Sequence, residues 1–226
     1  MHKLIAVLAA PASSEPAAFQ RRLLDGLPRR LAASPAPLRC VLNLVDVPAP
    51  AGKSSTATPY AAVIELWFET FEFNDGWDGF AGWRMGTDGF PSAAAAHVYH
   101  VKEVVQLDDA EPRPLGRRAA GVKAIYLVRR HAALSDAEAR QRWREHAPLA
   151  RTHHAGMLRY VQNGVITALT PGAPLIHGIA ELRFPTYDDF ERRMFDSAAG
   201  RAAIAADAGG LVAEAVPLFC GEYVLR

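Results

Sequence analysis

The chain of 226 residues has little of several features that mark particular protein classes. It has only two cysteines, Cys40 and Cys220, which cannot form a disulfide framework or a cysteine-rich zinc site. It has no excess of charge, because 25 Lys and Arg residues balance 24 Asp and Glu residues. Nucleic acids and anionic membranes select concentrated basic surfaces, so we expect neither as a partner. No segment approaches the ~20 apolar residues of a membrane helix.

The N-terminus also lacks the pattern of a secretory leader. Its apolar run, residues 4–10, is short and is followed directly by Pro11. A similar segment recurs inside the chain at 122–130, and a cleaved leader has no reason to be copied in the body of a protein. With no leader and two cysteines far apart in sequence, we expect a cytoplasmic location.

Motifs for common cofactors are missing as well. The sequence contains no Gly-rich phosphate loop, dinucleotide fingerprint, nucleophile elbow or CxxC motif. We therefore expect no bound cofactor. What remains is an ordinary globular composition, 50% apolar and 22% charged, with enough aliphatic side chains for a sizeable core.

The most informative feature that is present is an internal repeat. Three hexamers of the first half align, in the same order, with three of the second: 38–43 with 158–163, 3–8 with 123–128, and 63–68 with 179–184. The offset is 120 residues for the first two pairs and 116 for the third. Agreement of three hexamers in order indicates a duplication. The sequence therefore predicts two modules, 1–107 and 122–226, joined by a polar linker at 108–121.

Each module has the pattern of a ferredoxin-like unit. In the second half we expect strands at 122–129, 158–168, 176–184 and 222–225. A helix begins at Ser135, where Glu138 completes a capping box, and a second begins at Thr186. In the first half we expect strands at 3–9, 38–47, 60–68 and 97–106, with a helix over 15–33. The predicted order, β-α-β-β-α-β, belongs to the α+β class.

The alternation of side chains predicts how the two sheets meet. In 176–184, Gly178, Ala180 and Leu182 form an apolar side for the helices, while His177 and Glu181 lie on the other, partly charged side. Two such open faces can bury each other, which gives a single-chain pseudo-dimeric α+β barrel around a partly polar cleft. Glu65 occupies the place equivalent to Glu181. A buried carboxylate needs a partner, and Arg183 or Arg159 is the expected one.

The second half resembles the EthD-like proteins of the dimeric α+β barrel superfamily. The resemblance rests on KAIYLVRR at 123–130, Leu134-Ser135, WREHAPL at 143–149 and LRYVQN at 158–163. The first half lacks the motif and reads LDGLP at 24–28, so it looks like a degenerate copy. The resemblance implies a barrel with a small-molecule cleft. Members of the family accompany the oxidative breakdown of ethers or the tailoring of polyketide and aromatic compounds.

His146, within that motif, is the candidate catalytic residue. With a reference pKa near ~6.5, it can act as a general base toward a phenol or a C–H beside a carbonyl. The alternative is that it caps the C-terminus of its helix. The candidate ligand-binding residues are Tyr126, Tyr160, His177, Glu181 and Trp67.

Two further groups of residues have alternative interpretations. His153 and His154 follow His146 closely, but no Asp or Cys nearby completes a ligand set, so we predict no metal or haem. Aromatic residues alternate with glycines in the first half, at Trp77, Phe80 and Trp83 among others. This segment is either a flap over an apolar ligand or a loop that completes the core.

Three functions remain open at this point. The first is an EthD-like barrel that binds a small apolar or aromatic molecule, with cofactor-free acid–base chemistry on aromatic, ether or polyketide compounds. The second is a non-catalytic accessory or binding protein for a partner oxygenase. The third is a cofactor-independent oxidoreductase or monooxygenase. The sequence leaves open whether the chain is an enzyme, and whether it forms a homodimer beyond the intrachain pseudo-dimer.

Overall fold

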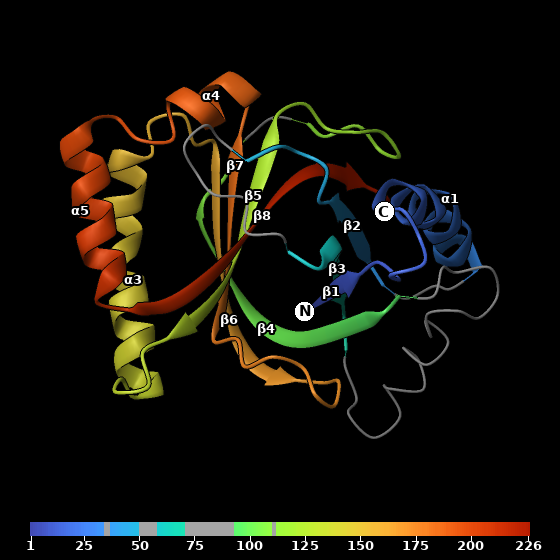
Figure 1. The fold of residues 1–226 in the computed structure, drawn as a ribbon, viewed down its shortest axis with the longest axis horizontal. Helices are drawn as coiled ribbons and strands as arrows, with labels where there is room; N and C mark the ends of the chain where they lie inside the picture. Colours follow the sequence, from blue (N-terminus) through green and yellow to red (C-terminus); the bar gives the residue numbers. More distant parts are fainter. Residues whose placement is uncertain (34–36, 50–57, 71–92, 110–111) are drawn as a thin grey trace.

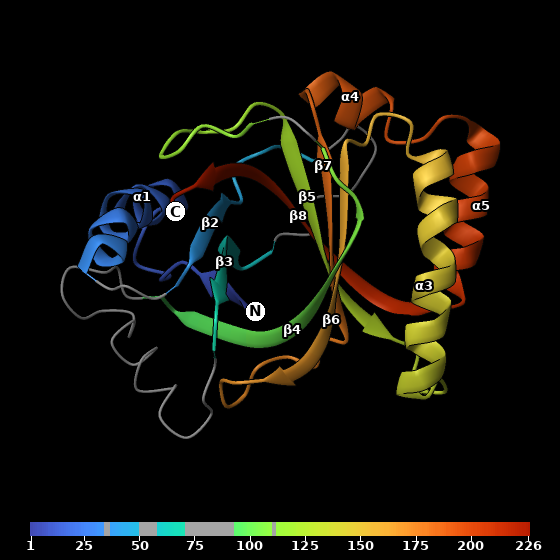
Figure 2. The ribbon, with the colours of Figure 1, turned by 180° about the vertical axis from the view of Figure 1, so that it is seen from behind.

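A closed antiparallel barrel of eight strands forms the centre of the computed structural model, which describes residues 1–33, 37–49, 58–70, 93–109 and 112–226. The strands are β1 (His2–Ala9), β2 (Arg39–Leu44), β3 (Tyr60–Phe68), β4 (Ala95–Leu107), β5 (Val122–Arg130), β6 (Arg159–Ala168), β7 (Gly178–Phe184) and β8 (Val212–Val224). The helices are α1 (Pro16–Ala33), α3 (Asp136–His153), α4 (Tyr187–Arg192) and α5 (Ala198–Gly209). Helix α1 covers one side of the barrel, and α3 and α5 cover the opposite side (Figures 1 and 2). The expected α+β barrel is confirmed.

The order of the strands is the same in both halves of the chain. Around the barrel, β4-β1-β3-β2 is followed by β8-β5-β7-β6. The register also matches, because Ile5 lies opposite Glu65 as Ile125 lies opposite Glu181. The two halves meet where β2 pairs with β8 and where β4 pairs with β6.

The last strand and the helices before it differ from the prediction. β8 begins at Val212, ten residues before the expected start at Glu222. Pro217 conceals it in the sequence, since proline is uncommon within a sheet, yet here it lies opposite Tyr126 of β5. The helical region after Thr186 is divided into α4 and α5, and Ser197 caps the start of the second. The capping box of Ser135 and Glu138 is present as expected.

Apolar side chains pack in three layers. Phe19, Leu23 and Leu27 of α1 cover the outer face of the first-half sheet. α3, α4 and α5 cover the outer face of the second-half sheet, where Ala180, Leu182 and Phe184 of β7 face them. A third cluster fills part of the barrel interior, and it includes Ile5, Ile125 and Ile179. The alternation predicted for β7 is therefore confirmed.

The rest of the described interior holds a lysine–glutamate cage, which we define as Lys3, Lys123, Glu65, Glu103, Glu181 and Glu222. The ammonium group of Lys3 lies 2.8 Å from a carboxylate oxygen of each of Glu65, Glu103 and Glu181. The ammonium group of Lys123 contacts Glu65 and lies 2.7 Å from Glu181 and 3.1 Å from Glu222. Both lysines are almost fully buried. Each has three carboxylate partners, which replace the water that the ammonium group loses on burial.

The expected partners of the buried glutamates were wrong. Arg183 pairs with Asp109, and Arg159 pairs with Asp108, both near the end of β4. Lysines take their place because Lys3 of β1 and Lys123 of β5 point into the barrel. There each lysine contacts Glu65 of β3 and Glu181 of β7, so each pairs with a glutamate of its own half and one from across the barrel. Alternation along one strand shows which face a residue occupies, but not which strand lies across the barrel.

The cage makes the stability of the protein depend on pH, because its carboxylates must stay ionised. Burial alone would raise the pKa of Glu65, but the ammonium groups of Lys123 and Lys3 outweigh it and hold that pKa well below its ordinary value. The pKa values of Glu103 and Glu222 are also lowered, against the effect of burial, by the neighbouring lysines. A carboxyl group with a lowered folded-state pKa stabilises the fold above its unfolded-state pKa, and this contribution is lost as the pH falls through the folded value.

We therefore expect the urea midpoint to fall as the pH is lowered from about 4.5, the region in which unfolded glutamates bind protons. Circular dichroism at a series of pH values measures this. The variant Glu222→Gln removes one of the three carboxyl groups, so its midpoint should depend less steeply on pH. Equal slopes for the two proteins would contradict this account.

Candidate functional site

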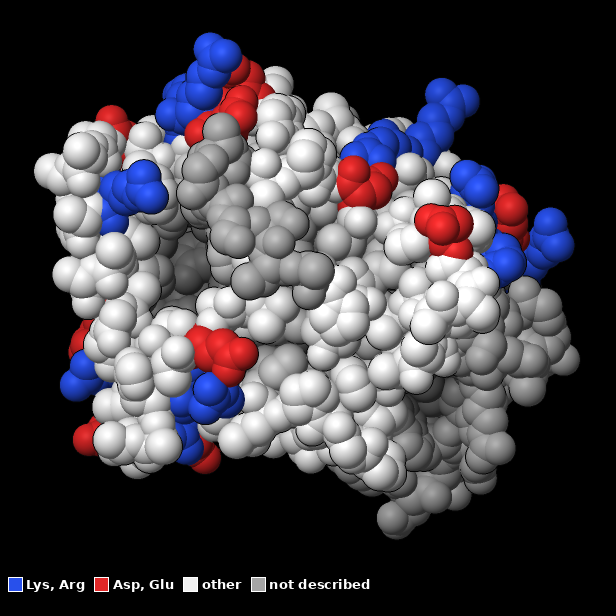
Figure 3. All heavy atoms as spheres, in the orientation of Figure 1, with Lys and Arg blue, Asp and Glu red and all other residues white. Residues whose placement is uncertain are grey.

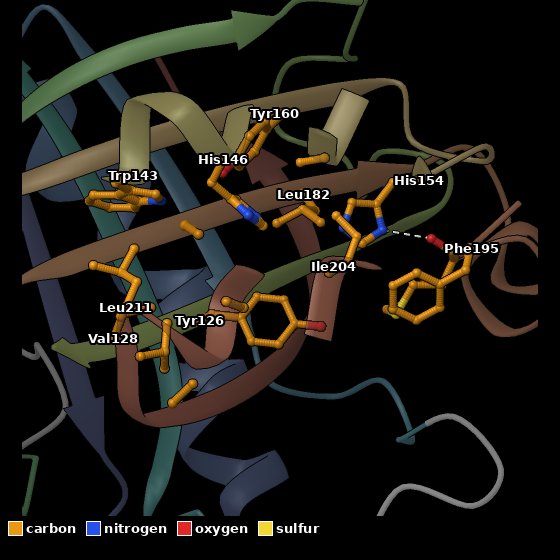
Figure 4. A pocket seen from close by; sticks show the side chains of 16 residues that line it. Tyr126, Val128, Trp143, His146, His154, Tyr160, Leu182, Phe195, Ile204 and Leu211 are labelled. Carbon is orange, nitrogen blue, oxygen red and sulfur yellow. Dashed lines mark hydrogen bonds between the residues drawn. The ribbon is translucent and has the colours of Figure 1, made fainter. Parts of the chain in front are cut away.

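A pocket of about 280 Å³ lies outside the barrel, between the second-half sheet and helices α3 and α5 (Figure 4). Figure 3 shows a hollow at this place, between the helical side of the molecule and the barrel. Most of the sixteen lining residues are apolar, and Val128, Leu182, Ile204 and Leu211 are examples. The polar groups of the lining are two tyrosines, two histidines and the indole of Trp143. None of the lining residues that the structure describes is Lys, Arg, Asp or Glu.

At some matching positions the second half carries smaller side chains than the first. Helices α1 and α3 both have 18 residues, with proline at the thirteenth position, so they can be compared position by position. Phe19 of α1 corresponds to Ala139 of α3, and Leu27 corresponds to Ala147. In the sheets, Ile64 of β3 corresponds to Ala180 of β7, which lines the pocket.

Three of the six predicted site residues line this pocket. His146 reaches it from α3, Tyr126 from β5 and Tyr160 from β6 (Figure 4). Burial raises the pKa of both tyrosines to about 12, so both hydroxyls keep their protons near neutral pH. The Tyr160 oxygen accepts a hydrogen bond from Nε2 of Gln162 at 2.9 Å, and this bond fixes the position of the hydroxyl group.

The other three predicted residues lie elsewhere. Glu181 belongs to the cage, and Nε1 of Trp67 donates to the cage carboxylate of Glu103 at 3.1 Å. His177 precedes β7, and its Nδ1 accepts from the backbone N–H of Arg130 at 3.4 Å. The expectation that this site lies between the two sheets was wrong. The cage and the inner apolar cluster occupy the described interior, while the pocket is on the other face of the second-half sheet.

His146 forms a pair with Asp207 of α5. Its Nδ1 lies 2.6 Å from the Asp207 Oδ2, and its side chain is 14% exposed. A carboxylate can only accept, so Nδ1 carries the proton and Nε2 keeps its lone pair. His146 lies in the middle of α3, seven residues before its end, so the alternative of a C-terminal cap was wrong. In this geometry the Asp207 carboxylate orients the imidazole ring through Nδ1 and leaves Nε2 available to accept a proton.

Sequence reasoning missed three contributors to the site. Trp143 was part of the recognised motif, and its ring lies so close to the backbone that a Cβ on Gly178 would come within 2.2 Å of it. His154 also lines the pocket, and its Nδ1 donates to the backbone carbonyl of Met194 at 2.6 Å. Asp207 carries no sequence signal, because it is 61 residues from His146.

His146 and His153 of α3 and His154, which follows it, bond to three different acceptors. His146 bonds to Asp207, His153 bonds to Asp196 at 3.0 Å, and His154 bonds to Met194. Within the described ranges, no group of three or more His, Cys, Asp or Glu residues is arranged to hold a metal ion.

Two other findings complete the description. The glycine- and aromatic-rich segment that was considered as a flap, with Trp77, Phe80, Trp83 and Phe90, lies outside the described residues. In the part of the chain that is described, no helix is both long and apolar enough to cross a membrane.

Comparisons with known proteins agree with this fold. The family model of the EthD domain matches residues 131–215, which include α3, His146 and Asp207. A search of curated proteins finds no match. Among solved structures, an anthrone oxidase-like protein is 13% identical with a TM-score of 0.63, over 100% of this chain and 92% of that one.

Two further structures are similar at lower scores. A candidate monooxygenase from Lactobacillus acidophilus NCFM is 11% identical with a TM-score of 0.52, over 100% of this chain and 95% of that one. A chlorite dismutase from Candidatus Nitrospira defluvii is 10% identical with a TM-score of 0.54, over 98% and 90%. At these identities the likeness is one of fold. The EthD family model thus matches residues 131–215 of this chain, and the chain as a whole has the α+β barrel fold of these structures.

Proposed function

We propose that the chain binds a small apolar or aromatic molecule in the pocket beside α3, and that His146 acts there as a general base without a bound cofactor. The observation that carries this proposal is the His146–Asp207 pair in the wall of an otherwise apolar pocket. Nδ1 is held by the carboxylate, so Nε2 is the atom that accepts a proton. Tyr126 and Tyr160 are the hydroxyl groups available to orient the ligand.

The pair suits proton abstraction from a phenol or from a carbon beside a carbonyl. With Nδ1 bonded to the carboxylate, the neutral imidazole presents the lone pair of Nε2, which is able to take up a proton. The negative charge of Asp207, 2.6 Å from Nδ1, stabilises the imidazolium that forms. Apolar walls keep water away from the reacting atoms, which strengthens these electrostatic effects.

The architecture that holds the site is, we propose, a duplicated ferredoxin-like module. Modules 1–107 and 122–226 have the same strand order and matching registers, which supports this reading. In the intervening segment, Leu115 forms a bridge with Val224, so part of the proposed linker packs on β8. Two buried, unpaired cysteines fit a reducing cytoplasm.

Hydrogen–deuterium exchange of a carbon acid tests the role of His146 directly. The probe is 2-tetralone, a two-ring ketone with acidic C–H groups beside its carbonyl, incubated with the protein in D₂O and followed by NMR. We expect the protein to accelerate exchange over buffer. The variant His146→Gln should reduce this acceleration about a hundredfold, the lower end of the range for a general base.

A matched control is available on the same helix. His153 bonds to Asp196 much as His146 bonds to Asp207, but it does not line the pocket. His153→Gln should therefore exchange the probe at the wild-type rate. If His146→Gln binds the probe and exchanges it as fast as wild type, His146 is not the base. If the wild-type protein binds the probe without accelerating its exchange, the site is a binding site alone, as in an accessory protein. If no apolar two-ring probe binds, the proposed function fails altogether.

Oxygenation without a cofactor is a second candidate, which the candidate monooxygenase and the anthrone oxidase-like protein among the neighbours favour. The first step of such a reaction is the same proton abstraction by His146. The carbanion or phenolate then gives up electrons to dioxygen. Consumption of oxygen in the presence of 2-tetralone or a two-ring phenol, measured with an electrode, separates this candidate from simple acid–base chemistry.

A further inference from the structure

The hydroxyl group of Tyr126 has no hydrogen-bond partner among the described residues, although it stands in an apolar pocket. Tyr126 lies on β5 directly opposite Ala180, whose small side chain leaves the space beside the ring open. In Figure 4 the ring enters the pocket from the sheet and its oxygen points towards Ile204 and Phe195. The hydroxyl is open to the pocket, where the oxygen of a bound ligand can serve as its acceptor.

The ionisation state of Tyr126 makes it a donor. Burial raises its pKa to about 12, so the proton stays on the oxygen throughout the neutral range. The other tyrosine of the pocket differs, because the oxygen of Tyr160 already accepts a bond from Gln162. Tyr126 is therefore the hydroxyl whose hydrogen bonding is left entirely to the ligand.

The described lining of the pocket disfavours anionic ligands. A buried carboxylate or phosphate needs a cation, and no lysine or arginine is among the lining residues within the described ranges. The imidazolium of His146, if it forms, is already balanced by Asp207 at 2.6 Å. An anion would thus lose its hydration without a lysine or arginine among the described lining residues to replace it.

The volume of the pocket limits the size of the ligand. A cavity of about 150 Å³ in another protein holds benzene. The present pocket has about 280 Å³, almost twice as much, which corresponds to two fused rings. Trp143, Leu182 and Leu211 provide the flat and branched apolar surfaces against which such rings pack.

We propose that the pocket selects uncharged two-ring molecules that carry a carbonyl or ether oxygen, and that Tyr126 is the specificity-determining residue, which donates its hydroxyl proton to that oxygen. This inference rests on the proposed function, because it concerns the same pocket. It adds to that function the chemical class of the ligand and the residue that recognises the ligand oxygen. It also gives Tyr126 and His146 separate tasks, since one holds an oxygen and the other removes a proton.

Three probes with one carbon skeleton test the proposal by isothermal titration calorimetry at pH 7.5. They are 2-tetralone, which has the oxygen; tetralin, which is the hydrocarbon; and tetralin-2-carboxylate, which is the anion. We expect the ketone to bind about tenfold more tightly than the hydrocarbon, the effect of one well-placed hydrogen bond. The carboxylate should bind at least a hundredfold more weakly than the ketone, since its charge is buried without a partner.

The variant Tyr126→Phe removes only the hydroxyl. It should bring the affinities for ketone and hydrocarbon to within about twofold of each other and leave hydrocarbon binding unchanged. Tyr60→Phe is the matched control, because Tyr60 lies on β3 of the first half and does not line the pocket. This control should keep the wild-type preference for the ketone. Unfolding curves of both variants show whether the fold is retained.

The outcomes separate the inference from the proposed function. Equal binding of ketone and hydrocarbon by the wild-type protein would overturn the inference and leave the apolar pocket standing. A preference that survives in Tyr126→Phe, or tight binding of the carboxylate, would also overturn it. If none of the three probes binds, the proposed function is wrong and the inference falls with it.

Discussion

Replacing Lys123 by methionine should lower the free energy of unfolding by about 3–5 kcal/mol, the range found when one partner of a buried ion pair is removed. Methionine preserves the length of the side chain but has no charge. Glu65, Glu181 and Glu222 would then lose the ammonium group that all three contact inside the barrel. Urea unfolding at pH 7 measures the change.

Lys102 provides the control for this experiment. It lies on β4 of the same barrel, but its side chain is exposed. Lys102→Met should change the free energy of unfolding by no more than about 0.5 kcal/mol, as is usual for surface positions. Adding Glu181→Gln to Lys123→Met should restore part of the lost stability, because one uncompensated carboxylate disappears. A loss below about 1 kcal/mol in the single variant would show that the cage relaxes or takes up water.

Ala180→Phe should abolish binding of two-ring ligands, a loss of more than about a thousandfold in affinity. Ala180 lines the pocket beside Tyr126, and its side chain faces the helices. A benzene ring occupies a cavity of about 150 Å³, which is more than half of the volume available here. Calorimetric titration with tetralin and 2-tetralone measures the loss.

A smaller side chain at the same position provides a second test in case Ala180→Phe fails to fold. Ala180→Ile introduces the residue found at the corresponding place in the first half, where Ile64 lies opposite Ala6. It should weaken binding by an intermediate factor, roughly tenfold, because overpacking typically costs 1–3 kcal/mol. If Ala180→Phe folds normally and still binds tetralin as tightly as wild type, the ligand does not occupy this pocket.

Local patterns predicted the fold because they repeat. The hexamer pairs located six of the eight strands, and the alternation along β7 correctly separated Ala180 and Leu182 from Glu181. Apolar periodicity in a strand depends only on which face is buried, so it can be read without knowledge of the partner strand. The extent of β8 could not be read in this way, since Pro217 interrupts the strand pattern.

The site was predicted less completely, for a geometric reason. The proposed lining residues came from both faces of one sheet: Tyr126 faces the helices, whereas Glu181 faces the barrel interior. A single pocket cannot contain both. Alternation along β7 shows that Ala180 faces the helices. It does not give the register of β7 with β5, and that register is what brings Tyr126 opposite Ala180. The partner of His146 depends on how α5 packs on α3, and that contact joins residues too distant in sequence for any periodicity to reveal.

Closure of the barrel also determines how this molecule can meet others. Every strand has a hydrogen-bonded neighbour on each side, from β1 round to β4. A sheet with free margins presents rows of unsatisfied amide and carbonyl groups, which invite intermolecular strand addition and fibril growth. Such rows are removed wherever a strand pairs on both sides, whereas 212–216 of β8 pair with β5 alone. Around the fully paired part of the barrel, association with another macromolecule therefore proceeds through side chains on the outer surface.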